Sequence, residues 1–383
     1  MSEFDAIRPY HDDEVAPVLQ RLIRDEELVD SIIRLKFGKS LAKAGFLLRP
    51  VVRGRLRKQF GAIHTVAGFQ AEIETYLEKV LNDTIDDLTV SGLESLDPES
   101  AYLFISNHRD ITMDPALVNL VLYRAGFSTL RIAIGDNLLT KPFASDLMRL
   151  NKSFIVNRSA KAPREKFQAA KLLSSYIHHS VMVDNENVWI AQREGRAKDG
   201  RDLTNSAIIS MLAMSRDKSQ TLADYIRDAR VVPVSISYEF DPCDADKARE
   251  LTIVKQQGKY EKQEHEDVQS IARGITGYKG RVHLAFGEQL SGEYETAEEV
   301  TAELDRQISA NYRLHSTNML AYNKLEGHWP ELDFGGVGER FDPEHFKREQ
   351  RLFKSRLEAI PAEYHTMLLE AYANPVRGKL HAG

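Results

Sequence analysis

The sequence predicts an α/β protein with a mostly parallel mixed sheet flanked by helices, a helical N-terminal region and a helical C-terminal extension. Between about residues 84 and 320, short apolar runs typical of buried strands alternate with segments of helical spacing. Helical spacing dominates on both sides of this region. The composition, with 42% hydrophobic and 28% charged residues, is that of an ordinary globular protein. Alternation of this kind favours a parallel sheet with crossover helices.

The elements follow from the local pattern in chain order. Residues 5–82 are expected to be mostly helical. A helix is expected to begin near Pro115, since proline is favoured in a first helical turn. The expected strand segments are 89–100 (a short strand and a turn), 101–106, 131–139, 153–158, 187–195, 230–240 and 281–290. The other expected helices are 166–180, 264–275, 296–314 and most of the final 50 residues. We therefore expect three parts: 1–83, 84–320 and 321–383.

Length, charge and cysteine content exclude several classes of protein. A chain of 383 residues predicts one large domain with appendages, or two domains. Its single cysteine, Cys243, excludes an intramolecular disulfide framework and a cysteine zinc site. The net charge of −6 argues against bulk nucleic-acid binding. The polar, acidic start and the lack of an 18-residue apolar run lead us to expect a cytoplasmic chain without a transmembrane helix.

Positive charge is concentrated in one segment, residues 31–60, which holds nine basic residues and no acidic one. Apolar residues recur there at helical spacing, and Pro50 is expected to end or kink the helix. A basic amphipathic helix favours an anionic membrane surface, where each Lys or Arg contributes about 1 kcal/mol. The alternative is a core-packing helix with a solvated basic face.

The segment most informative about chemistry is SNHRDITMDPAL, residues 106–117. His108 follows a predicted buried strand, and open α/β sheets place ligands at the carboxyl ends of their strands. Asp110 and Asp114 both lie within about one helical turn of His108. A histidine beside a carboxylate is the minimum for a general base, because the carboxylate orients the ring and stabilises its protonated form. A carboxylate that caps the helix beside an ordinary loop histidine is the alternative.

Four blocks of sequence, in order, resemble the glycerolipid acyltransferase family, which includes glycerol-3-phosphate and lysophosphatidate acyltransferases. The first block combines a G-x-E-x-L turn in LTVSGLESL with AYLFISNHRDITMDPAL, which is similar to the strand and NH-x4-D motif of the family. The other blocks are SFIVNR at 153–158, VWIAQREGRAKDGRD at 188–202 and VVPVSISYE at 231–239. They are similar to the family's strand ending in Arg, its E-G-x-R loop and its proline-containing strand.

The chain departs from the family pattern at two places. The family motif puts Asp five residues after His, but here that position is Met113, and Asp114 is one residue further on. Either a bulge brings Asp114 back to His108, or Asp110 orients the ring. The run DPA beginning at Asp114 resembles soluble plastid-type members and favours Asp114. In the third block, Arg193 stands where the family has proline, and Arg196 follows Gly195 directly.

The resemblance implies acyl transfer from a thioester to the hydroxyl of lysophosphatidate. His108, oriented by Asp114, would remove the hydroxyl proton. The acceptor phosphate would need cations, and arginine meets phosphate oxygens with two parallel hydrogen bonds. Glu194 would brace the arginines or the loop, and Gly195 would permit a close backbone approach. The cations implied for the phosphate are Arg158, Arg193, Arg196 and Lys198.

The expected partners follow from this reaction. The resemblance implies acyl-coenzyme A or acyl-acyl carrier protein as co-substrate and requires neither a cofactor nor a metal. We expect contact with a phospholipid membrane through 31–60, on the inner face of the membrane, and no nucleic acid. Glycerol-3-phosphate or another lipid alcohol is the alternative acceptor. A non-catalytic lipid-binding protein on the same scaffold is the rival from another class.

Overall fold

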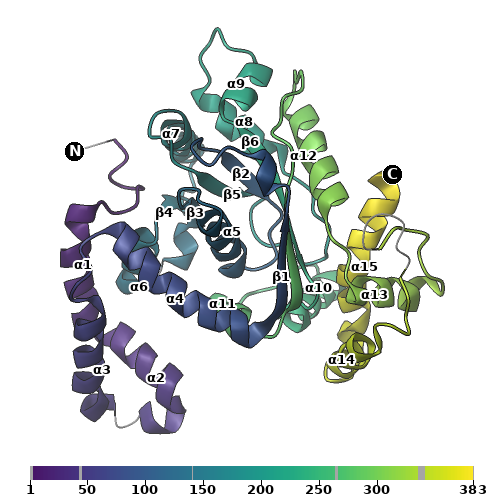
Figure 1. The fold of residues 1–383 in the computed structure, drawn as a ribbon, viewed down its shortest axis with the longest axis horizontal. Coiled ribbons are helices and arrows are strands. Elements are labelled where there is room, and N and C mark those ends of the chain that lie inside the picture. The colour runs from purple at the N-terminus through teal and green to yellow at the C-terminus, as the bar shows by residue number, and fades with distance from the viewer. Residues whose placement is uncertain (1–2, 43–44, 140, 264–265, 335–340, 383) are drawn as a thin grey trace. The chain divides into compact units, whose positions relative to one another are not determined.

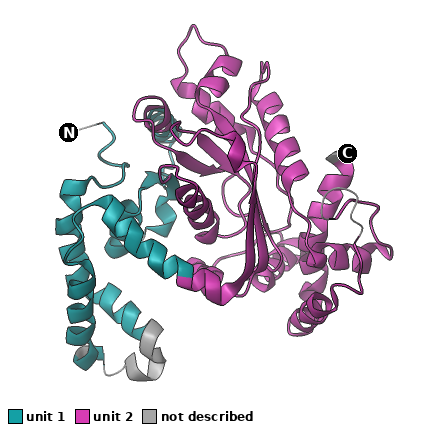
Figure 2. Ribbon diagram, viewed as in Figure 1, with its two compact units in different colours: residues 1–78, 131–176 teal, residues 79–130, 177–383 magenta. Residues whose placement is uncertain are grey.

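The computed structural model describes residues 3–42, 45–139, 141–263, 266–334 and 341–382. It consists of two compact units (Figure 2). Unit 1 comprises residues 1–78 and 131–176, and unit 2 comprises 79–130 and 177–383. The segment 131–176 therefore groups with the N-terminal helices. The part boundaries expected after residues 83 and 320 stay a prediction.

Unit 1 is built mainly of helices, with one pair of parallel strands, β3 and β4. Helix α1 buries Val15, Val18, Leu19 and Leu22 against Phe69 and Leu150. This spacing of three and four residues lines one helical face with apolar side chains. The elements are α1 (Asp12–Arg24), α2 (Glu26–Ala42), α3 (Gly45–Phe60), α4 (Val66–Thr84, which runs into unit 2), β3 (Arg131–Gly135), η2 (Asp136–Leu138), α6 (Pro142–Leu150), β4 (Ser153–Val156) and α7 (Pro163–Met182, which also runs into unit 2).

The basic segment 31–60 forms parts of two helices, and Pro50 does not end either of them. Helix α3 runs from Gly45 to Phe60 through Pro50. Val52 and Leu56 on α3 are buried against Ile23, Val29 and Ile33, so packing compensates for the backbone donor that proline lacks. The expectation that Pro50 ends a helix is therefore wrong, whereas a kink there stays a prediction. Residues 43–44 lie outside the described part of the chain.

Unit 2 contains a mixed, mostly parallel sheet with the strand order β1-β7-β6-β2-β5. Only β6 and β7 run antiparallel within this order. Strands β2 and β6 are buried along their whole length, as expected of central strands covered on both faces. The strands are β1 (Ile85–Ser91), β2 (Leu103–Ser106), β5 (Val188–Ala191), β6 (Val231–Tyr238) and β7 (Gly280–Phe286). The predicted fold class is confirmed.

The helices of unit 2 extend to the end of the described chain, and the last three lie together (Figure 1). They pack over an apolar core that also includes Phe240 and Ala248. This layer, α13 to α15, includes the described part of the segment 321–383 that we expected to be helical, and we call it the C-terminal extension. Helices α8, α9 and α10 were not foreseen from the sequence. The elements are η1 (Leu93–Ser95), α5 (Met113–Arg124), α8 (Ser206–Leu212), η3 (Ala213–Ser215), α9 (Leu222–Asp228), α10 (Asp244–Gln257), α11 (Glu266–Thr276), α12 (Ala297–Asn311), α13 (Ser316–Glu326), α14 (Lys347–Glu358), η4 (Ala362–Tyr364) and α15 (His365–Ala382).

Among the residues described, no helix has both the length and the apolar character needed to cross a membrane.

Gly92, in the turn after β1, is required both by its positive φ and by the close approach of β7. Two variants separate these causes. Gly92 and Gly126 both have positive φ, but only at Gly92 would a Cβ collide, 1.9 Å from the Phe286 carbonyl oxygen. Gly126→Ala should cost about 1–2 kcal/mol from backbone strain alone. Gly92→Ala should lower the free energy of unfolding further, because β7 must also shift. Denaturant unfolding of both variants measures the difference, and equal losses would contradict the close approach.

Acid should destabilise unit 2 through His283 on β7. Burial, followed by the charges of Arg313 and Lys379, lowers the pKa of His283 to about 4. The unfolded chain binds this proton below its ordinary pKa, about 6.5, and the folded chain does not. The stability is therefore present above pH 6.5 and is lost as the pH falls toward 4, by up to about 1.4 kcal/mol per pH unit. In His283→Gln, which keeps groups to pair with Thr89 and Ser91, the unfolding free energy should fall less steeply across this range. Parallel pH dependences in the two proteins would exclude His283 as the source.

Candidate active site

The candidate site lies at the carboxyl end of β2, where the chain leaves the sheet and enters α5. Asn107 anchors this exit: its side chain accepts from the Ile236 N–H at 2.8 Å and donates to the Ile236 carbonyl at 3.0 Å. The same amide also donates to Asp202 at 3.0 Å. Asn107 therefore ties the start of the loop to β6 and to the segment that follows β5. Strand ends in open α/β sheets are where ligands bind.

His108 and Asp114 form a contacting pair. The Nδ1 atom of His108 lies 2.8 Å from Oδ2 of Asp114. Asp114 is fully buried, and the His108 side chain is 13% exposed. Because an ionised carboxylate only accepts hydrogen bonds, we assign the Nδ1 proton to His108 as the donor. In this tautomer Nε2 carries the lone pair and is the basic atom of the ring.

Asp114 accepts from four donors among the described residues. Besides His108, the backbone N–H groups of Arg109 and Asp110 donate to Oδ2, at 2.6 and 2.9 Å. The Tyr238 hydroxyl donates to Oδ1 at 2.7 Å. Burial, followed by the Asp114 charge, raises the pKa of Tyr238 well above 10, so this hydroxyl stays a donor. These bonds stabilise the charged form of a carboxylate that water does not reach.

The residue inserted relative to the family motif is accommodated in the loop before α5. Met113 occupies the position five residues after His108 and is buried as the first residue of α5. Asp114 follows it in the first helical turn, and the loop backbone wraps around its carboxylate. The extra residue thus leaves the contact between His108 and a carboxylate intact. Of the two candidates, Asp114 is the one bonded to His108.

Asp110 instead caps α5. Its Oδ1 accepts from the N–H groups of Thr112 and Met113, at 3.0 and 2.9 Å, which satisfies donors at the helix start. Burial and then the charge of Asp114 raise the pKa of Asp110. Helix α11 passes so close that a Cβ on Gly274 would lie 2.1 Å from Asp110 Oδ2.

Two buried aromatic residues, Tyr238 and Trp189, make specific contacts at the site. Tyr238 supplies the hydroxyl bonded to Asp114. Trp189 packs edge-on against the His108 ring, with 5.6 Å between ring centres, and its indole N–H donates to the Ser106 hydroxyl at 3.0 Å. Nothing in a strand sequence reveals these bonds, because they join elements that are distant in the chain.

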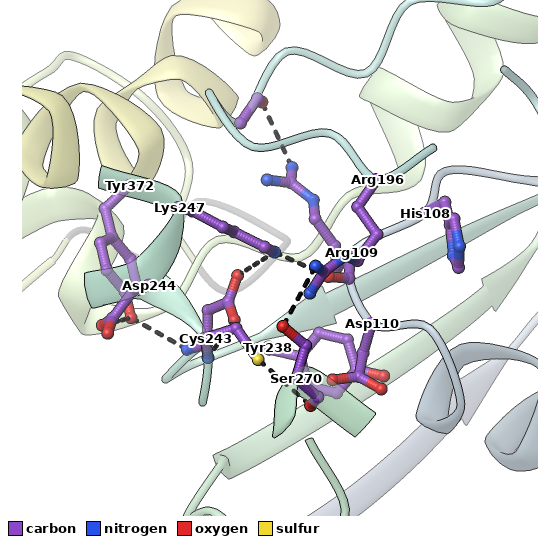
Figure 3. Close-up of polar contacts among 12 residues, drawn as sticks. His108, Arg109, Asp110, Arg196, Tyr238, Cys243, Asp244, Lys247, Ser270 and Tyr372 are labelled. Atoms are coloured by element: carbon purple, nitrogen blue, oxygen red, sulfur yellow. Dashed lines mark hydrogen bonds and ion pairs between the residues drawn. The ribbon is translucent and has the colours of Figure 1, made fainter. Parts of the chain in front are cut away.

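The loop that follows β5 is attached to His108 through the backbone. The Ala197 N–H donates to the His108 carbonyl at 2.7 Å. Arg196 precedes it and donates from Nη2 to the Ser270 hydroxyl at 3.4 Å, while Nη1 is buried without a hydrogen-bond partner among the described residues. Figure 3 shows the Arg196 side chain directed toward Ser270. Lys198 forms an ion pair with Glu250 on α10.

The other predicted phosphate-binding residues differ in their surroundings. Arg193 is half-buried, and Glu194 and Gly195 are exposed. Gly195 has a φ of 73°, and no described atom lies within 4 Å of a Cβ built on it. Its left-handed backbone therefore accounts for glycine here better than the expected close approach. Arg158 belongs to unit 1, where its N–H donates to Asp136 at 3.1 Å.

This arrangement is suited to general-base chemistry. Nε2 of His108 can take a proton, and the buried carboxylate stabilises the imidazolium that results. Among the described residues, no group of three or more His, Cys, Asp or Glu side chains is placed to hold a metal ion.

Comparison with known proteins agrees with the blocks found in the sequence. A family model described as Acyltransferase matches residues 87–237. No curated protein matches the chain. Among solved structures, the chain is similar to the 1-acyl-sn-glycerophosphate (LPA) acyltransferase PlsC from Thermotoga maritima, at 14% identity and a TM-score of 0.36 over 83% of this chain and 97% of that one. His108, Asp114 and the loop at 188–202 all fall within the matched segment. Residues 87–237 therefore belong to the acyltransferase family.

Proposed function

We propose that the protein transfers a fatty acyl group from a thioester to the free hydroxyl of lysophosphatidate. Nε2 of His108 removes the hydroxyl proton while the oxygen attacks the thioester carbonyl. The tetrahedral intermediate then collapses, the carbon–sulfur bond breaks, and the thiolate takes the proton from His108. The products are an ester and a free thiol, and the histidine returns to its starting state. No acyl-enzyme, cofactor or metal is required.

The bond between His108 and Asp114 is the observation that carries this proposal. It occurs at the carboxyl end of β2, within the segment matched by the acyltransferase family. A general base with an orienting carboxylate contributes about 10²–10⁴-fold to a rate. The donor would be acyl-coenzyme A or acyl-acyl carrier protein, since both present a thioester.

The cations around the loop support an anionic acceptor. Arg196 is the strongest candidate, because its buried Nη1 has no hydrogen-bond partner among the described residues. Arg193, which is half-buried on the same loop, is the next candidate, and the role of Arg158, which belongs to unit 1, stays a prediction. Lys198 is already neutralised by Glu250, so we rank it lower. Glycerol-3-phosphate offers the same phosphate and is therefore the alternative acceptor.

Thiol release from palmitoyl-coenzyme A tests the reaction directly. Lysophosphatidate and glycerol-3-phosphate serve as parallel acceptors, and palmitoyl-acyl carrier protein as the second donor. Release that depends on lysophosphatidate supports the proposal. Thiol release with glycerol-3-phosphate alone would identify glycerol-3-phosphate as the acceptor in place of lysophosphatidate. No acceptor-dependent release with any pair would favour the lipid-binding rival.

Matched substitutions at the two carboxylates separate their roles. His108→Ala should lower kcat by about 10²–10⁴-fold. Asp114→Asn should also cause a large loss, because an amide neither fixes the histidine tautomer nor stabilises the imidazolium. Asp110→Asn is the control. Its amide oxygen can still cap α5, so kcat should fall much less than in Asp114→Asn. Steady-state kinetics on folded protein measures all three. A larger loss at Asp110 than at Asp114 would contradict the assigned pair.

We also propose that α3 binds the anionic surface of a membrane from the cytoplasmic side. Leu47 and Val51 lie one turn apart on α3 and are 64% and 65% exposed. Arg55 and Lys58 are exposed on the same helix. Arg49 instead pairs with Asp30 on α2, at 2.7 Å. Apolar side chains beside cations that form no ion pair with a described residue suit the boundary between headgroups and acyl chains. The products of the proposed reaction partition into such a surface.

Sedimentation with liposomes checks this surface. Binding should require anionic lipid and should fall as salt increases, because the attraction is screened. Arg55→Gln/Lys58→Gln should weaken binding by about 2 kcal/mol in total. Lys354→Gln/Lys347→Gln, on α14 and also exposed, is the matched control. Undiminished binding to neutral liposomes in high salt would exclude the electrostatic attachment.

A further inference from the structure

A buried lysine on α10 contacts the backbone of the candidate catalytic motif. Lys247 is 3% exposed, and its Nζ donates to the Arg109 carbonyl oxygen at 2.6 Å. Arg109 directly follows His108 in the chain. In Figure 3 the Lys247 side chain extends toward Arg109. A desolvated ammonium group is costly unless it is paired, so this contact needs an accompanying anion.

The anion is Asp241, at the end of β6. Its carboxylate forms an ion pair with Lys247. Burial alone would raise the pKa of Asp241, but the charge of Lys247 and its hydrogen bond reverse this effect, and the pKa is lowered. Lys247 therefore joins two fixed points, the carboxylate of Asp241 and the carbonyl of Arg109. A small cavity of about 30 Å³ lies beside them.

The C-terminal layer holds the turn that carries Asp241. The Tyr372 hydroxyl on α15 accepts from the Asp241 N–H at 2.9 Å and donates to Asp244 at 2.8 Å. Arg356 on α14 donates to the Asp241 carbonyl at 2.6 Å and to Asp244 at 2.5 and 2.9 Å. Two helices from the extension therefore position the counter-anion of Lys247.

At its other end, Lys247 acts on the backbone that surrounds Asp114. The Arg109 carbonyl accepts from Lys247, and the Arg109 N–H donates to Asp114. The Arg109 guanidinium is held separately, by Asp202 at 2.6 Å and by the Gly200 carbonyl at 3.2 Å. A rotation of the peptide group between Arg109 and Asp110 would break the hydrogen bond from Lys247 to the Arg109 carbonyl. It would also move the Asp110 N–H away from the Asp114 carboxylate.

We propose that Lys247 is a positioning residue for the pair His108–Asp114, and that α14 and α15 supply its support through Arg356 and Tyr372. The proposal rests on the proposed acyl transfer for its kinetic consequence. Lys247 touches neither reacting atom, so its loss should affect the chemical step and leave substrate binding largely unchanged. Misplacement of a catalytic group by a fraction of an ångström to 1 Å can cost up to about 100-fold in rate.

Substitution of Lys247 tests the kinetic role. Lys247→Met keeps the length of the side chain and removes its charge and donors. The double variant Lys247→Met/Asp241→Asn avoids a buried unpaired carboxylate, in case the single variant does not fold. Both should lower kcat by about 10- to 100-fold with KM within about twofold of wild type. A kcat within twofold of wild type in the double variant would overturn the proposal.

Two variants of α15 distinguish positioning from general destabilisation. Tyr372→Phe removes only the hydroxyl and should lower kcat, as Lys247→Met does. In the double variant Tyr372→Phe/Lys247→Met, the loss of kcat should be smaller than the two single losses combined. Leu369→Ala is the matched control, because Leu369 is buried in the core of the same layer and its loss creates a cavity. It should lower the melting temperature more than Tyr372→Phe does and leave kcat unchanged. If kcat falls in step with the melting temperature across these variants, the positioning role of Lys247 is refuted.

A spectroscopic readout keeps this test separate from the proposed reaction. The Nδ1 proton of His108, held by Asp114, should give a slowly exchanging downfield proton resonance that disappears in His108→Ala. Lys247→Met should shift it or speed its exchange, and Leu369→Ala should not. If wild type transfers no acyl group but this pattern holds, the proposed function fails and the positioning role stands. An unchanged resonance in Lys247→Met would overturn the positioning role whatever the activity.

Discussion

The burial of one charged carboxylate, that of Asp114, is the constraint on which the rest of the site depends. An ion removed from water costs several kcal/mol unless donors replace the solvent. Here the donors are a histidine ring, two backbone N–H groups and a tyrosine hydroxyl. They come from the end of β2, the loop before α5 and the end of β6. The three elements must therefore be in register before the carboxylate is satisfied and the histidine is oriented.

A second set of bonds holds the loop after β5 against this centre. Ala197 bonds to the His108 carbonyl, and Asp202 accepts from both Asn107 and Arg109. The two segments of the acyltransferase motif thus stabilise each other through backbone and buried polar contacts. Arg196, which precedes Ala197 in the chain, is thereby held beside this centre, and its buried Nη1 has no hydrogen-bond partner among the described residues. A buried polar group without a protein partner can be satisfied by ordered water or by a ligand.

The C-terminal extension adds a further layer to this arrangement. Its helices share an apolar core with Phe240 and with Ala248 on α10, and their polar side chains reach the turn at Asp241 and Asp244. Asn374 on α15 also donates to the Asp199 carbonyl at 2.7 Å, and Gly200 has no room for a side chain because Ala371 lies against it. The extension therefore contacts the loop after β5 as well as the support of Lys247.

The sequence by itself determined the fold class, the mostly parallel sheet and the first turn of α5, because apolar periodicity and proline placement are local signals. It also singled out His108, and it limited the orienting carboxylate to Asp110 or Asp114. Only the tertiary structure decided between them, since the choice depends on how the loop backbone wraps around a buried charge. Only the tertiary structure also reveals the contacts of Tyr238, Lys247 and Tyr372 with the site, because these residues lie more than a hundred residues from His108 in the chain. Helix α3 passes through Pro50 for a related reason: packing against α1 and α2 outweighs the local preference to end a helix.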